Sequence, residues 1–172
     1  GASAFRLEVK ARLRREHRED EVNTFVFPDI PFQLRDGECS LLTGYTGHGK
    51  SELAYQMLTH EMASGHKLAI ASFEIDASEM ICNIGTQLLG HKPKEDEADK
   101  VIDWLDGRLW FITPKDDELK VNAAAEIFAD FDYAAQRFGC TRFLVDSLMF
   151  ICKKDDYEAQ DLLAKKCRDF GR

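Results

Sequence analysis

Proline and long apolar runs are scarce in this chain of 172 residues, which contains only 4 Pro. No repeat or low-complexity tract is visible, and 44% of the residues are hydrophobic and 31% are charged, which is typical of one globular domain. No apolar run approaches the roughly 18 residues of a membrane span, and no apolar signal core follows the basic N-terminus. We therefore expect a soluble cytoplasmic protein without a membrane partner.

A surplus of basic residues is also missing, since 23 Lys and Arg stand against 31 Asp and Glu, for a net charge of −8. This balance argues against affinity for nucleic acid through an overall basic surface, although it allows a local basic site. The five cysteines are odd in number, widely spaced and without a C-x-x-C pair, so neither a disulfide framework nor a zinc site is indicated. They are Cys39, Cys82, Cys140, Cys152 and Cys167.

The first 18 residues differ in charge from the rest, because they hold six basic residues and two acidic ones. Within them Phe5, Val9 and Leu13 recur every four residues, which predicts a helix with one narrow apolar stripe. We predict a basic linker or docking helix over 1–18, with a DNA-binding arm as the alternative that also fits its charge. A linker is expected over 19–36, where prolines oppose a helix.

From residue 37 to 172, short apolar runs alternate with helical patterns. We expect strands at 39–43, 68–73, 109–112 and 142–145, and helices at 50–64, 77–89, 97–105, 124–138 and 156–170. Almost continuous apolar strands that alternate with helices indicate an α/β fold with a mostly parallel sheet covered on both faces. No strand follows the last helix, so we expect the C-terminal part of this core to be missing from the chain.

A phosphate-binding loop is predicted between the first expected strand and the helix after it. The pattern G-x-x-x-x-G-K-[ST] is matched by Gly44, Tyr45, Thr46, Gly47, His48, Gly49, Lys50 and Ser51. The glycines allow the backbone N–H groups and the helix N-terminus to approach phosphate oxygens. Lys50 is expected to bridge the outer phosphates and the Ser51 hydroxyl to bind Mg²⁺. His48 either contacts a phosphate or is simply exposed.

Two acids follow apolar strands and are expected at the carboxyl edge of the sheet, where α/β proteins bind ligands. Asp146 is predicted to hold the Mg²⁺ shell opposite Ser51. Glu74 is predicted to orient or deprotonate the water that attacks the γ-phosphate, and a plain solvated carboxylate is the alternative. Asp76 and Glu79 instead have the spacing of a helix cap.

In this order, the segments 37–51, 69–74, 143–149 and 155–160 resemble the RecA-like motor domain of hexameric DnaB-type replicative helicases, and phage helicases and primase-helicases above all. The resemblance spans about residues 20–170 and implies a RecA-like P-loop NTPase sandwich of three layers. It gives Glu74 the role of the ATPase glutamate. It also implies that the family's sensor and arginine finger would lie beyond Arg172.

The resemblance implies an ATP-dependent DNA helicase motor of a bacterial cell or a phage-infected host, which assembles into a ring, expected to be a hexamer. Hydrolysis of ATP or another NTP with Mg²⁺ would drive movement along single-stranded DNA, beside a primase domain or primase partner. Lys153 and Lys154 are candidates for a DNA-contacting loop, with a solvated charged pair as the alternative. A RecA/KaiC-like assembly or regulatory ATPase is the second hypothesis. A small-molecule phosphotransferase is the third, but it needs an Arg-rich lid that is not obvious here.

Overall fold

The computed structural model describes residues 2–7, 9–10, 26–27, 29–30, 34–45, 47–112, 123–147 and 156–170. The chain divides into two units, Gly1–Leu34 and Arg35–Arg172. The first unit contains a short 3₁₀ helix, η1 (Ala2–Phe5), followed by helical residues at 6–7 and 9–10. Phe5 and Val9 of the predicted apolar stripe are 57% and 52% exposed, and Leu13 lies outside the described residues. The docking role of this segment stays a prediction.

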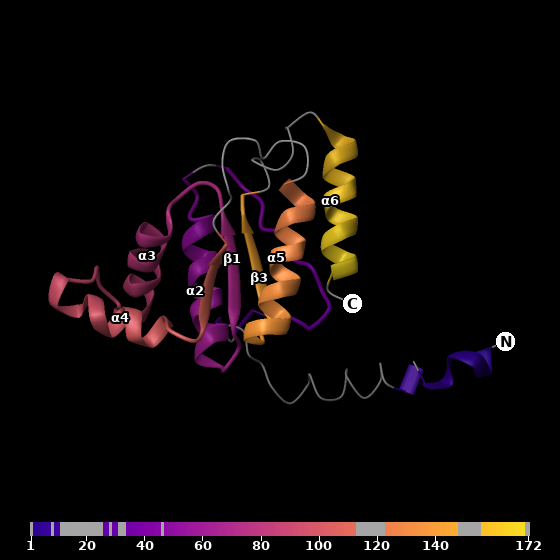
Figure 1. Ribbon diagram of the computed structural model, residues 1–172, viewed down its shortest axis with the longest axis horizontal. Coiled ribbons are helices and arrows are strands. Elements are labelled where there is room, and N and C mark those ends of the chain that lie inside the picture. Colours follow the sequence, from indigo (N-terminus) through magenta and orange to yellow (C-terminus); the bar gives the residue numbers. More distant parts are fainter. Residues whose placement is uncertain are drawn as a thin grey trace. The chain divides into compact units, whose positions relative to one another are not determined.

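The second unit is an α/β structure built on a three-stranded parallel sheet (Figure 1). The strands are β1 (Leu68–Ser72), β2 (Leu109–Ile112) and β3 (Arg142–Asp146), in the order β2-β1-β3. The register pairs Leu68 with Leu109 and Ser72 with Asp146, so the three strands end at the same edge. These strands confirm the expected ones at 68–73, 109–112 and 142–145 to within one residue at each end.

The helices also follow the prediction closely. They are α2 (Lys50–Ala63), α3 (Ala77–Leu89), the 3₁₀ helix η2 (Glu95–Glu97), α4 (Ala98–Leu105), α5 (Ala123–Phe138) and α6 (Tyr157–Phe170). The Asp76 side chain caps α3 by accepting a hydrogen bond from the Glu79 amide at 2.9 Å, as its spacing predicted. Gly139, with a φ of 75°, follows α5 in the left-handed conformation expected of a helix stop. None of the described helices is long and apolar enough to cross a membrane.

One expected strand is absent. Residues 39–43 form no strand and no sheet hydrogen bonds, and Leu41 and Leu42 are 70% and 41% exposed. A parallel strand is stable where covering layers bury both of its faces, and the described residues provide no such cover for this segment. The prediction of a strand at 39–43, which rested on the apolar pattern alone, is therefore wrong.

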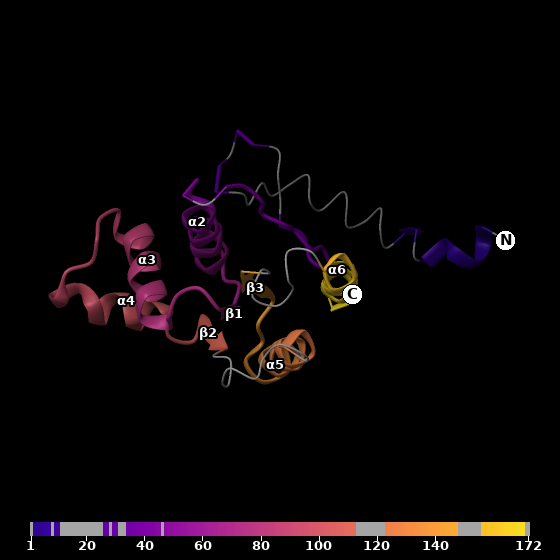
Figure 2. The same cartoon turned by 90° about the horizontal axis from the view of Figure 1, so that it is seen from above.

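The helices cover both faces of the sheet, as Figure 2 shows from above. Because side chains alternate along β1, Leu68 and Ile70 face α2, α3 and α4, whereas Ala69 and Ala71 face α5. The small alanines leave room for Phe131 of α5, which is 1% exposed. Tertiary packing on each face thus fixes which side of β1 each helix covers.

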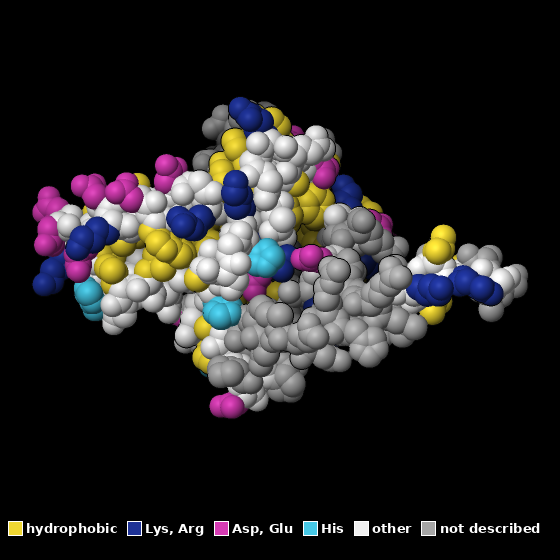
Figure 3. Space-filling view, turned by 90° about the horizontal axis from the view of Figure 1, so that it is seen from below, with side chains coloured by type: hydrophobic (Ala, Val, Ile, Leu, Met, Phe, Trp, Pro, Cys, Tyr) yellow, Lys and Arg dark blue, Asp and Glu magenta, His cyan; other side chains and the backbone are white. Residues whose placement is uncertain are grey.

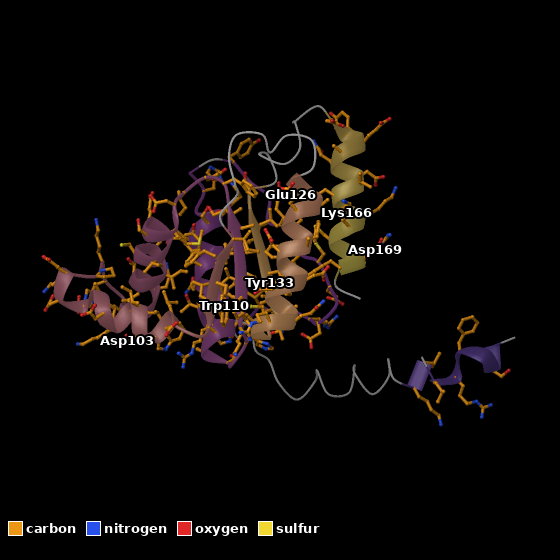
Figure 4. The ribbon with its side chains drawn as sticks, viewed as in Figure 1. Asp103, Trp110, Glu126, Tyr133, Lys166 and Asp169 are labelled. Carbon is orange, nitrogen blue, oxygen red and sulfur yellow. The ribbon has the colours of Figure 1, made fainter. Side chains whose placement is uncertain are left out.

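Aromatic rings close the lower end of the α5 face. Trp110 of β2 stacks on Phe138 with ring centroids 4.9 Å apart, and Tyr133 meets the same Phe138 edge-on at 5.8 Å. Figure 4 labels Trp110 and Tyr133 at this end, with Glu126 at the opposite end of α5. Offset and edge-on ring pairs of this kind add about 0.5–1.5 kcal/mol each beyond area burial.

Candidate functional site

The predicted phosphate loop leads directly into α2, which begins at Lys50. Gly47 and Gly49 have φ values of 81° and 76°, in the left-handed region that strains residues with a Cβ, so glycine is suited to both positions. Within the described residues, no side chain caps α2. Its first N–H groups are therefore available to an anion, and the positive end of the helix dipole lies beside them.

The Lys50 side chain folds over this loop. Its Nζ donates a hydrogen bond to the Tyr45 carbonyl oxygen at 2.9 Å, and the His48 amide points to the same oxygen at 3.3 Å. The rings of Tyr45 and His48 meet edge-on at 5.5 Å on the exposed side. Thr46 lies outside the described residues. The cation of Lys50 is thus held at the loop by one main-chain bond, which a phosphate oxygen can replace.

Glu74 and Asp146 emerge at the same edge of the sheet. Asp146 ends β3 opposite Ser72, and its carbonyl accepts a hydrogen bond from the Phe73 amide at 2.7 Å. Glu74 is the next residue and is exposed, so its carboxylate is accessible to water. The neighbours of β1 are β2 and β3, because the segment before the phosphate loop joins no sheet.

Electrostatics connect the loop to these two acids. Burial and then the charge of Glu74 raise the pKa of Asp146, while the Lys50 cation lowers it in part. Two of the predicted site residues, Lys50 and Glu74, therefore both act electrostatically on a third, Asp146. The raised pKa shows that negative charge at Asp146 is incompletely compensated. An added cation would relieve this repulsion.

The donor set fits Mg²⁺ bound together with a phosphate, and does not fit a metal cage made by the protein alone. Among the described residues, no three His, Cys, Asp or Glu side chains converge as metal ligands. Mg²⁺ keeps several waters and usually takes one or two carboxylates plus substrate phosphates, so Asp146 with the Ser51 hydroxyl is a sufficient protein contribution. A magnesium ion there would supply positive charge to the outer phosphates.

Sequence reasoning missed Tyr55, a buried residue of α2 that is 1% exposed. Its hydroxyl has no hydrogen-bond partner in the described part of the chain. Burial raises the pKa of this phenol, and the charges of Asp146, Glu52, Glu79 and Glu74 raise it further. The signal that could have found it is its spacing, because Tyr55 lies one helical turn after Ser51.

A second charged cluster lies at the opposite, amino edge of the sheet. Arg142 donates from Nε to Glu61 Oε2 at 2.7 Å and from Nη1 to Asp36 Oδ1 at 2.6 Å. His66 Nε2 lies 3.3 Å from Arg142 Nη2, and His66 Nδ1 lies 3.0 Å from Thr141 Oγ1. Figure 3, viewed from below, shows histidine, basic and acidic side chains gathered on this face. The cluster fixes the end of α2 to the start of β3, away from the phosphate loop.

The two candidate DNA contacts, Lys153 and Lys154, lie outside the described residues, so their assignment stays a prediction. The chain matches no protein-family model, and no curated protein matches its sequence. Support for a function therefore comes from the loop and the acids at the sheet edge.

Proposed function

We propose that this chain is a Mg²⁺-dependent P-loop ATPase with a RecA-like core, and that it is the motor domain of a ring-forming, DnaB-like DNA helicase. The observation that carries the proposal is that both Lys50 and Glu74 act electrostatically on Asp146. Lys50 begins the helix after a glycine-rich loop, and the two acids emerge together at the carboxyl edge of β1 and β3. This combination is that of a phosphate-binding loop with a metal-binding acid and a water-activating acid.

In the proposed reaction, the N–H groups of the loop and of the first turn of α2 bind the phosphate oxygens of ATP. Lys50 exchanges its bond to the Tyr45 carbonyl for the outer phosphates and neutralises charge that develops during transfer. Asp146 and the Ser51 hydroxyl would hold a magnesium ion, which would supply positive charge to the outer phosphates. Glu74, which is exposed to solvent, orients a water and accepts its proton.

The helicase part of the proposal rests on the resemblance of segments 37–51, 69–74 and 143–149 to DnaB-type motors. Movement along single-stranded DNA would require basic residues that converge in a ring channel, which an acidic subunit can still provide locally. A RecA/KaiC-like ATPase without strand separation is the alternative outcome of the same experiment. It predicts ATP-dependent assembly but no effect of DNA on hydrolysis.

Phosphate release from ATP, measured with and without single-stranded DNA, tests the proposal. We expect slow Mg²⁺-dependent hydrolysis by the wild-type chain and stimulation by DNA when the chain assembles. Glu74→Gln should bind ATP with the wild-type affinity but lower turnover by about 10²- to 10⁴-fold, because it removes the proton acceptor. Hydrolysis by Glu74→Gln as fast as that of the wild type would contradict the role of Glu74, and no Mg²⁺-dependent hydrolysis by the wild type would contradict the ATPase assignment. Hydrolysis that DNA does not change, with no DNA binding, would contradict the helicase assignment alone.

A further inference from the structure

Tyr55 is placed to connect the interior of the protein to the proposed nucleotide site. It follows Ser51 by four residues in α2, so the two side chains share one face of the helix, one turn apart. Helical side chains incline toward the N-terminus and cover the turn before their own Cα. The Tyr55 phenol therefore extends toward the end of α2 that carries Ser51 and the phosphate loop.

The ring and the hydroxyl of Tyr55 lie in different surroundings. The ring belongs to the apolar cluster that includes Met62, Ile70 and Met80. The hydroxyl has no hydrogen-bond partner in the part of the chain that the structure describes, although the residue is 1% exposed. After burial, the charges of four carboxylates raise the pKa of this hydroxyl further, and Asp146 has the largest effect of the four.

An unpaired buried hydroxyl destabilises a protein by about 1–3 kcal/mol, and most buried hydroxyls have a partner. Phenylalanine would fill the same apolar space without this loss. The ligand-free fold thus holds an unsatisfied buried donor on the α2 side of the sheet. Leu144 of β3 packs against the same cluster, and Asp146, the acid proposed to bind magnesium, follows it by two residues and so faces the same side. Since burial keeps the phenol protonated, it can donate a hydrogen bond but is not itself suited to be a metal ligand.

We propose that Tyr55 is a positioning residue whose hydroxyl donates a hydrogen bond to the Asp146 carboxylate when Mg²⁺ and nucleotide are bound. This inference rests on the proposed function and names one more residue of the same site. The bond satisfies the buried hydroxyl only in the loaded protein. Tyr55 thereby favours the orientation of Asp146 that binds the metal, and couples occupancy of the phosphate loop to the core between α2 and the sheet.

The test compares Tyr55→Phe with the wild-type chain by isothermal titration with ATP, in Mg²⁺ and in EDTA. The substitution removes one oxygen and keeps the ring. We expect the affinity in EDTA to stay within about twofold, and the increase in affinity produced by Mg²⁺ to fall about ten- to a hundredfold, which is the effect of one hydrogen bond to a charged group. The melting temperature without nucleotide should stay the same or rise, because the unpaired hydroxyl is gone.

Tyr133→Phe is the matched control, since it makes the same chemical change on α5, where Tyr133 is 60% exposed. It should leave all three measurements at the wild-type values. An undiminished effect of Mg²⁺ in Tyr55→Phe would overturn the inference and leave the proposed function intact. An equal loss of affinity in Mg²⁺ and in EDTA would overturn it as well, because it would show a general packing effect. A wild-type chain that binds no ATP would instead contradict the proposed function, and this inference with it.

Discussion

Breaking the ion pair between Arg142 and Glu61 by removing one partner is expected to destabilise the protein strongly. The side chains are 14% and 4% exposed, and the Nε–Oε2 distance is 2.7 Å. Arg142→Leu leaves the Glu61 carboxylate buried without this partner, and breaking a buried pair in this way costs about 3–5 kcal/mol. His66 Nε2 lies 3.7 Å from the same carboxylate oxygen and remains as a polar neighbour of Glu61 in the variant. We therefore expect the lower end of that range.

A loss of about 3 kcal/mol corresponds to a fall of roughly 6–12 °C in melting temperature for a domain of this size. Urea unfolding followed by circular dichroism measures the loss directly. The control is Lys165→Leu, which breaks an exposed i,i+4 pair with Asp161 whose side chains are 56% and 65% exposed. Such a pair contributes about 0.3–0.5 kcal/mol.

Adding Glu61→Leu to Arg142→Leu should recover much of the lost stability, because the unpaired charge is then removed and apolar contact replaces the pair. Two results would refute the reasoning. One is an Arg142→Leu variant no less stable than the Lys165→Leu control. The other is a double variant less stable than Arg142→Leu itself.

Two further substitutions test the packing and the electrostatics of the same unit. Gly85→Ala should destabilise the protein by about 1–3 kcal/mol in urea unfolding, because a Cβ there would lie 2.8 Å from Pro93 Cγ and 3.1 Å from Val101 Cγ1; an unchanged midpoint would contradict this. Because the pKa of Asp146 is raised, the folded state binds a proton at its carboxyl group more tightly than the unfolded state does. The stability that this proton provides is present below the ordinary pKa of 3.8 and is lost as the pH rises through the pKa of the folded state. Without nucleotide, Asp146→Asn should therefore melt above the wild type at pH 7, by a margin that narrows toward pH 4; a lower melting temperature at pH 7 would show that the carboxylate is stabilised instead.

Local sequence signals predicted most of the fold. The apolar runs at β1, β2 and β3 and the cap at Asp76 each reflect forces that act over a few residues, and all were located to within one residue. The strand expected at 39–43 failed because pairing depends on distant partners and covering layers. A short apolar pattern carries no information on either.

The candidate site also has residues that local sequence signals predicted and residues that they did not. The spacing of the loop identified Lys50, and strand ends identified Glu74 and Asp146, since a motif and a strand terminus are both local features. The sequence did not identify Tyr55 as a site residue, because its importance depends on its burial and on carboxylates from other elements. The Arg142 cluster escaped for the same reason, because Asp36, Glu61 and Arg142 come together only in the folded chain.

The central claim is that the loop ending at Lys50 binds the phosphates of a nucleotide together with Mg²⁺. Titration calorimetry of ATP into the wild-type chain and into Lys50→Ala, in Mg²⁺, tests it most directly, since binding does not require a complete ring. We predict binding by the wild type and an affinity about ten- to a hundredfold weaker for Lys50→Ala, which loses a charge-assisted bond to phosphate. Equal affinities, or no heat of binding in the wild type, would contradict the claim.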